Sequence, residues 1–331
     1  MAEMTYAAAI RYAMESEMER DPHVFLMGED IGVYGGAFGV TAGMIDRFGR
    51  DRIRDTPIAE EAIVGTGIGS ALVGMRPIVE MQFSDFIMNA MDQIVNQAAK
   101  IYFMFGGQMT VPLVIRGPAG AGTGAAAQHS QSLEAWFHHV PGLKVVMPAT
   151  PDDARGLLLA AIRDPNPVIF FEHKLLYKMK GEVAESAEAL PLGKASVRRQ
   201  GQHATVATYS AMLWHVLEAA ERLHDGGWDV EVIDLRTIYP LDFEAIRQSV
   251  IKTGRIAVCH EAVGRGGVAA EVAARIMESD VFDYLESPLL RITGLNSPVP
   301  YSPPLEKAFL PSVERIATQL ENWLRKEGVN P

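Results

Sequence analysis

The stretch KVVMPATPDDARGLLLAAIRDPNPVIFF, residues 144–171, predicts a strand, a helix and a second strand in direct succession. The strands are expected at residues 144–147 and 167–171, which are short and apolar, and the helix at residues 151–163. Apolar strands that alternate with helices form a mostly parallel sheet that is covered on both faces. This stretch therefore indicates an α/β fold.

The same alternation extends in both directions along the chain. Before it, strands are expected at residues 24–27, 76–80 and 111–115, and helices at residues 5–21 and 90–103. After it, a charged segment with few long apolar runs interrupts the pattern. The alternation then resumes, with elements expected at residues 204–209, 214–224, 230–234, 242–253, 256–259, 269–278, 289–292 and 312–326.

A chain of 331 residues favours two domains. We expect both to be doubly wound α/β domains. The N-terminal domain is expected at residues 1–175, a linker at residues 176–201, and the C-terminal domain at residues 202–331.

Composition and charge exclude several classes of function. The formal net charge is -11, from 41 acidic and 30 basic residues, which argues against nucleic-acid binding. The single cysteine, Cys259, excludes an internal disulfide, and with no signal peptide we expect a cytoplasmic protein. The longest uncharged apolar stretch, residues 62–75, is glycine-rich and too short to cross a bilayer, so no membrane partner is expected.

Two glycine-rich segments suggest nucleotide or phosphate binding. GTGIG at residues 65–69 lacks the preceding strand of a dinucleotide fingerprint, and Ser70 stands where its third glycine belongs. A helix that allows close backbone approach explains this segment better. GPAGAGTG at residues 117–124 has the flexibility to cradle a phosphate, although it lacks the Lys-Ser/Thr ending of a P-loop.

Several polar residues stand where such sheets carry their sites. His129 follows the second glycine-rich loop, and it is open whether this imidazole acts as an acid or base or is only solvated. Glu60 and Glu61 follow Pro57, and adjacent acids there are typical of the first turn of a helix. Glu29 comes directly after an expected strand.

Taken together, long segments of the chain resemble the beta subunits of the first, decarboxylating component of 2-oxo acid dehydrogenase complexes. The resemblance runs from about Thr5 to Ile316, in the order typical of that family. The segments that carry it are GEDIGVYGGAFGVTAG (28–43), RIRDTPIAEEAIVGTGIGSALVGMRPIVEMQF (52–83), DQIVNQAAK (92–100), the run from AAAQHSQ to VIFFE (125–172) and DVEVIDLRTIYPLD (229–242).

The resemblance implies a transketolase-like fold and a thiamine diphosphate site. The N-terminal domain would bind the pyrimidine of the cofactor, and the C-terminal domain would be of the transketolase C-terminal type. Glu60 matches the glutamate that bonds N1′ of the aminopyrimidine, Phe86 an aromatic lying against that ring, and His129 a histidine that handles protons during decarboxylation or acyl transfer. Glu29 is expected as a further cofactor contact.

The resemblance also implies a structural potassium ion. An oxygen-only set of ligands suits such a hard cation. An ordinary turn is the alternative explanation of RDPNP, residues 163–167. The matching residues are Leu113, Ala161, Ile162, Asp164 and Asn166.

One half of the family's cofactor site is missing. The motif that binds diphosphate and magnesium, GDG followed downstream by an asparagine, does not occur; the nearest string, DGG at residues 225–227, is typical of a helix end. In the family this half comes from an alpha subunit in an alpha2-beta2 heterotetramer. We therefore expect an alpha partner that holds most of the magnesium ligands, and a lipoyl-bearing dihydrolipoamide acyltransferase core.

The expected function is oxidative decarboxylation of pyruvate with acyl transfer to lipoyl groups, active only with an alpha subunit. FEHKLLYKMKGEV at residues 171–183 also resembles acetoin dehydrogenase beta subunits, which makes acetoin the second choice. Branched-chain 2-oxo acids rank third, because NAMDQ (89–93) and YFMFGG (102–107) are less similar to that branch. A non-catalytic scaffold subunit and a nucleotide-binding oxidoreductase are the alternatives from other classes.

Overall fold

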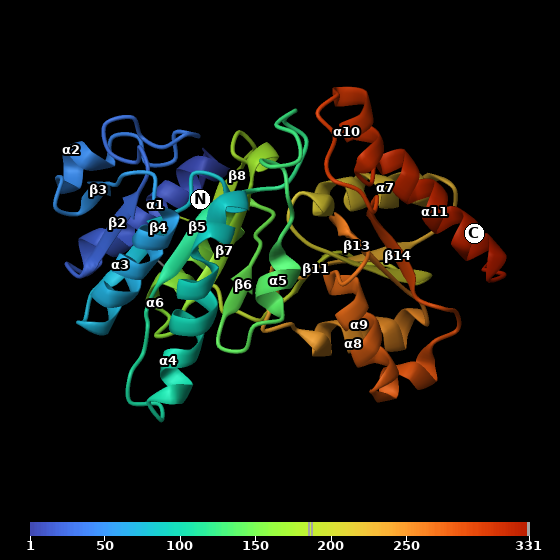
Figure 1. Cartoon of the computed structure of the whole chain (residues 1–331). Coiled ribbons are helices and arrows are strands. Elements are labelled where there is room, and N and C mark those ends of the chain that lie inside the picture. The colour runs from blue at the N-terminus through green and yellow to red at the C-terminus, as the bar shows by residue number, and fades with distance from the viewer. Residues whose placement is uncertain (185, 187, 330–331) are drawn as a thin grey trace. The chain divides into compact units, whose positions relative to one another are not determined.

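The computed structural model describes every residue of the chain except 185, 187, 330 and 331 (Figure 1). The chain forms two compact units. The first unit comprises residues 1–119 and 136–192, and the second comprises residues 120–135 and 193–331. Among the described residues, none of the helices combines the length and apolar character needed to cross a bilayer.

The first unit is built on a parallel sheet with the strand order β6-β7-β5-β4-β2-β3. Every residue of β2, β5 and β7 is buried, as expected where helices cover both faces of a sheet. The strands are β2 (Val24–Gly28), β3 (Ile53–Asp55), β4 (Arg76–Glu80), β5 (Val114–Ala119), β6 (Lys144–Val146) and β7 (Val168–His173).

Two groups of helices pack in the first unit. One pairs α1 with α6, and the other places α3 against β4, η1 and η2. A separate antiparallel pair joins β1 (Ala2–Thr5) to β8 (Lys180–Val183). The helices are α1 (Tyr6–Arg20), α2 (Met44–Phe48), α3 (Glu60–Leu72), η1 (Ser84–Ala90), η2 (Gln93–Ala98), α4 (Ala99–Met104), α6 (Pro151–Arg163) and η3 (Lys174–Leu176). Helix α5 (Glu134–His138) begins in the second unit and ends in the first.

The second unit holds a sheet with the order β14-β13-β10-β11-β9, parallel except for the edge strand β9. Helix α7 packs on α11, and η4 packs on α8 and α9. Its strands are β9 (Ser196–Arg199), β10 (Ala204–Thr208), β11 (Val230–Asp234), β12 (Thr237–Tyr239), β13 (Ile256–Val263) and β14 (Leu290–Gly294). Its helices are α7 (Met212–Asp225), α8 (Phe243–Thr253), α9 (Val268–Met277), η4 (Asp280–Tyr284), α10 (Pro303–Phe309) and α11 (Val313–Lys326).

Local capping explains where several helices begin. The hydroxyl of Thr5 accepts from the N–H of Ala8 at 3.1 Å, and the hydroxyl of Thr150 accepts from Asp153 at 3.2 Å ahead of a proline in the first turn. Such caps satisfy N–H groups that have no partner inside the helix.

The doubly wound α/β fold predicted for both domains is confirmed.

The structure differs from the sequence prediction at three places. Residues 90–103, expected as one helix, continue from the 3-10 helix η1 through the π-helix η2 into α4. Residues 176–201, expected as a linker, contain β8 and β9, and β9 extends the second sheet by pairing with β11. Residues 120–135 belong to the second unit although they lie within the expected N-terminal domain.

Gly142 is a position where the fold requires glycine. Its φ is +103°, and a Cβ there would lie 2.0 Å from the carbonyl oxygen of Ala99. We expect Gly142→Ala to lower the free energy of unfolding by about 2–5 kcal/mol, because overpacking against a backbone atom costs about 1–3 kcal/mol and the backbone strain about 1–2 kcal/mol more. Gly74 is the matched control, with φ +97° and nothing within 4 Å of the added carbon. Gly74→Ala should cost only the backbone strain of about 1–2 kcal/mol, measured by urea unfolding. Equal losses would contradict the steric explanation.

Candidate active site

Glu60 is the first residue of α3, and its side chain is buried at 8% exposure. Asn89 of η1 donates from Nδ2 to Oε2 of Glu60 at 3.2 Å. Within the described part of the chain, no hydrogen bond to Oε1 is present. The carboxylate is therefore held by one neighbour and has one oxygen available to a donor from outside the chain.

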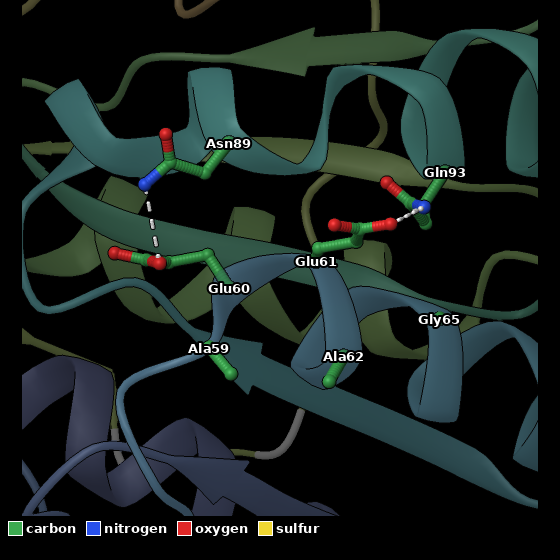
Figure 2. Close-up of a pocket in the computed structure, with 7 residues that line it drawn as sticks. All are labelled: Ala59, Glu60, Glu61, Ala62, Gly65, Asn89 and Gln93. Atoms are coloured by element: carbon green, nitrogen blue, oxygen red, sulfur yellow. Dashed lines mark hydrogen bonds between the residues drawn. The ribbon is translucent and has the colours of Figure 1, made fainter.

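Glu60 lines a pocket of about 590 Å³ between α3 and the helices η1 and η2 (Figure 2). Beside it, Glu61 accepts from Nε2 of Gln93 at 3.1 Å, so the adjacent acids have different partners. The absence of a side chain at Gly65 leaves space, since an added Cβ would come no nearer than 3.7 Å to Gln93. The pocket is lined by Ala59, Glu60, Glu61, Ala62, Gly65, Asn89 and Gln93. Its volume falls in the usual range for small-molecule sites.

Glu29 lies directly after β2 and is buried at 5% exposure. Burial raises the pKa of Glu29 above its ordinary value, and the negative charges of Glu60 and Asp30 raise it further. Glu29 and Glu60, which lie 31 residues apart in the sequence, are therefore within electrostatic reach of each other. A ligand that donates hydrogen bonds here would relieve their repulsion.

Phe86 lies on η1 and is half-buried. Its ring packs edge-on against Phe83, with the centroids 6.4 Å apart and an interplanar angle of 86°. Side chains three residues apart eclipse each other on a 3-10 helix. Phe86 and Asn89 therefore lie on the same side of η1, and Asn89 is the residue that bonds Glu60.

His129 lies in the second unit, on the loop of residues 120–135. Its backbone N–H donates to Ala126 at 3.3 Å. Three N–H groups of the glycine-rich loop before it bind carboxylates of the chain itself, so they are not open to a phosphate. Ala121 donates to Glu261 at 2.6 Å, and Gly122 and Gly124 donate to Glu306 at 2.7 and 3.0 Å. Sequence reasoning missed both glutamates.

The candidate potassium residues lie around the end of α6 and the start of β7. Lys144 donates to both carboxylate oxygens of Asp164, at 2.6 and 2.5 Å, and the N–H of Asn166 donates to the same carboxylate at 2.9 Å. The side chain of Asp164 is thus already neutralised. A cation here would rely on backbone carbonyl oxygens.

Those carbonyl groups also have partners. Leu113 accepts a strand N–H at 2.9 Å, Ala161 accepts the N–H of Asp164 at 3.3 Å, and Ile162 accepts Nη1 of Arg76 at 2.8 Å. The carbonyl of Asp164 also faces Arg76, at 3.4 Å. Carbonyl oxygens are suitable ligands for a hard cation, whereas the positive charges of Arg76 and Lys144 would repel one.

A buried charge network crosses the carboxyl half of the same sheet, and sequence reasoning missed it. Arg116 on β5 donates from Nε and Nη2 to Glu172 on β7, at 2.5 and 2.7 Å, and from Nη1 to Glu80 on β4. Tyr177 donates to Glu172 at 2.7 Å. Burial raises the pKa of Glu80, although the attraction of Arg116 opposes that effect. The network joins three neighbouring strands.

Comparison with known proteins identifies two domain families in the chain. The transketolase pyrimidine-binding domain matches residues 2–180, and the transketolase C-terminal domain matches residues 193–316. A split-gene transketolase described as an inactive beta4 tetramer superposes with a TM-score of 0.80 at 20% identity, covering 97% of this chain and 99% of that one. This likeness supports the fold alone.

Sequence relatives are more specific. The chain is 50% identical over 318 residues to 2-oxoisovalerate dehydrogenase subunit beta of Bacillus subtilis (strain 168), covering 96% of this chain and 97% of the relative. It is 48% identical over 317 residues to pyruvate dehydrogenase E1 component subunit beta of Rhizobium meliloti (strain 1021), covering 96% and 69%. The mitochondrial counterpart of Caenorhabditis elegans is 46% identical over 325 residues, covering 97% and 92%. The chain therefore belongs to the family of beta subunits of 2-oxo acid dehydrogenases.

Proposed function

We propose that the chain is the beta subunit of a thiamine-diphosphate-dependent 2-oxo acid dehydrogenase that decarboxylates pyruvate oxidatively and passes the acyl group to lipoyl. The observation that carries the proposal is the placement of Glu60. It is a buried carboxylate at the wall of a small-molecule-sized pocket, inside the region that matches a pyrimidine-binding domain.

The residues present fit the aminopyrimidine end of the cofactor. Glu60 would accept a hydrogen bond from N1′, because Asn89 engages only its other oxygen. The carboxylate of Glu29 would be a second buried hydrogen-bond acceptor nearby, and Phe86 would lie against the aminopyrimidine ring. When bound, thiamine diphosphate supplies the carbon acid and the electron sink that decarboxylation of a 2-oxo acid needs. The chain's own part is to orient the ring and to hold a proton at N1′.

The diphosphate end of the cofactor requires a partner. The chain has no GDG motif, and among the described residues no group of three or more His, Cys, Asp or Glu side chains is arranged to hold a metal. We infer that an alpha subunit supplies the magnesium and diphosphate ligands in an alpha2-beta2 assembly. A lipoyl-bearing acyltransferase core would then receive the acyl group. His129 would donate or accept a proton during this transfer.

A structural potassium ion is part of this proposal. It would bind through the carbonyl oxygens described above, near Leu113 and the turn from Ala161 to Asn166. Its role would be to brace the connection between α6 and β7, away from Glu60.

The cytoplasmic location expected from the sequence stays a prediction.

The substrate is proposed as pyruvate, with a branched-chain 2-oxo acid as the second candidate. The relatives that support pyruvate are 46–48% identical, and the 2-oxoisovalerate relative, at 50%, supports the second candidate. Acetoin, the second choice from the sequence, is the third substrate to test.

Reconstitution tests the proposal. We expect the chain alone to bind thiamine diphosphate weakly, and the chain with an alpha subunit that carries GDG and a downstream asparagine to bind it tightly. Calorimetry with magnesium measures both, and a nicotinamide nucleotide titration serves as the control for the oxidoreductase alternative. Lipoyl acylation rates with pyruvate, 3-methyl-2-oxobutanoate and acetoin then rank the substrates. Tight binding by the chain alone would contradict a shared site, and acylation with none of them would favour a scaffold.

A further inference from the structure

The loop that carries His129 is fastened by two buried carboxylates of the second unit. Gly120, Gly122 and Gly124 have φ values of +86°, +99° and +69°, a conformation that turns successive N–H groups toward one side. Such a concave backbone binds anions. Here the anions are Glu261, at the end of β13, and Glu306, on α10.

Glu306 depends on the loop as much as the loop depends on it. Its side chain is 4% exposed, and its two oxygens accept the N–H groups of Gly122 and Gly124. In the described part of the chain, no cationic side chain pairs with it. A buried carboxylate without a cation is stable only when hydrogen bonds compensate its lost hydration. The loop N–H groups provide that compensation.

Glu261 closes the loop around His129. One oxygen, Oε1, accepts the N–H of Ala121 at 2.6 Å and the hydroxyl of Ser132 at 3.2 Å. The N–H of Gly120 also donates to the carbonyl of Gln131 at 3.1 Å. These contacts tie positions before His129 to positions after it. The loop is thus a closed ring held at its base.

Apolar packing supports the same base. Ala121 is fully buried in a cluster with Val299 and Phe309, and Phe309 ends the helix that carries Glu306. Further along the segment, Glu134 is buried and accepts from the hydroxyl of Tyr209 at 2.8 Å. The ends of the segment are therefore fixed, and His129 lies between them.

We propose that Glu261 and Glu306 are positioning residues that fix the His129 loop for acyl transfer. The inference rests on the proposed function, because it takes His129 as the residue that serves the transfer. Neither carboxylate needs to touch substrate or cofactor. Each acts by holding backbone N–H groups, so their loss should leave events at Glu60 unchanged.

Glu306→Gln tests the proposal in the assembled protein. Only one oxygen remains, and the amide NH₂ faces a loop N–H, so donor meets donor. We expect lipoyl acylation to slow roughly ten- to a hundredfold, because small misplacement of a reacting group has effects of that size. Thiamine C2 proton exchange and kcat/KM for the 2-oxo acid should not change, because both report steps that precede acyl transfer. Amide hydrogen exchange across residues 120–132 should become faster.

Glu314→Gln is the matched control. Glu314 is exposed in the first turn of α11, and the chemical change is the same. It should alter neither acylation nor loop exchange, while Glu306→Asp, which keeps the charge and both acceptors, should recover part of the rate. His129→Ala sets the scale, since the loss in Glu306→Gln should not exceed it.

The outcomes separate this inference from the proposed function. Unchanged amide hydrogen exchange in Glu306→Gln would show that Glu306 does not hold the loop, whatever the rate of lipoyl acylation. Faster exchange with unchanged acylation would overturn the positioning role. Absence of acylation in the wild-type assembly with every 2-oxo acid would instead refute the proposed function, and the positioning role with it, while the exchange measurement still decides whether the carboxylates hold the loop.

Discussion

Glu60→Gln is expected to slow C2 proton exchange of bound thiamine diphosphate by about 10²–10⁴-fold, the usual contribution of a positioned acid or base. The amide keeps the length of the side chain and one oxygen that can accept from Asn89, as Oε2 does at 3.2 Å. It then presents an NH₂ group where a carboxylate oxygen stood. The proton at N1′ loses its acceptor, so the ring is no longer held in the reactive form.

Glu61→Gln is the control for that change. Glu61 is the next residue of α3, is exposed, and accepts from Gln93 at 3.1 Å. The same substitution there should leave the exchange rate within about twofold, since no role in proton transfer is assigned to it. Exchange at the wild-type rate in Glu60→Gln, with the cofactor still bound, would refute the assignment of Glu60.

The pKa of Glu29 gives a second test of Glu60 that does not require enzyme activity. The charge of Glu60 is one of the causes that raise the pKa of Glu29. Removing that charge should therefore lower the pKa of Glu29 toward its ordinary value, which carboxyl NMR titration of the assembled protein would detect.

Arg116→Met is expected to lower the free energy of unfolding by about 3–5 kcal/mol, the usual cost of leaving buried charges without their partner. Arg116 is 1% exposed and is the cation that Glu80 and Glu172 share. Methionine fills much of the volume but donates no hydrogen bond. Arg47→Met is the control, because Arg47 forms surface pairs with Glu15 and Glu19 and its side chain is 48% exposed. Its loss should cost less than about 1 kcal/mol.

The deficit of Arg116→Met should depend on pH in a defined direction. Burial already raises the pKa of Glu80, and loss of the opposing attraction of Arg116 raises that pKa further above its value in the unfolded chain. Groups whose pKa is raised on folding stabilise the native state at low pH and lose that contribution as pH rises through the folded pKa. Urea unfolding should therefore show a smaller deficit at pH 5 than at pH 8. A pH-independent deficit would contradict the electrostatic explanation.

Local signals in the sequence predicted the elements that depend on local interactions. Helix α6 was predicted with the bounds that the structure has, because Pro151 and the apolar spacing after it mark its start and period. Strand β9 was missed because it is a charged edge strand, and its pairing with β11 is a tertiary contact. A helical period likewise cannot distinguish the π-helix η2 from an ordinary helix.

The candidate site divides in the same way. Adjacent acids at the start of a helix predicted the backbone position of Glu60, whereas its chemical role came from the resemblance. Glu261 and Glu306 had no signal, because they bond loop residues 140 and 184 positions away in the sequence. Glycine content alone suggested a phosphate there, since sequence does not reveal which acid reaches the loop.

The second unit is discontinuous, and this has a consequence for how such chains can recombine. The chain passes between the units at residues 119–120, 135–136 and 192–193, so a single crossover near residue 193 does not exchange the C-terminal domain whole. It brings Glu261 and Glu306 from one parent and the loop of residues 120–135 from the other. Chimaeras of distant relatives joined there would unite mismatched halves of a buried interface. Viable exchange would have to carry the loop along with the domain that holds it.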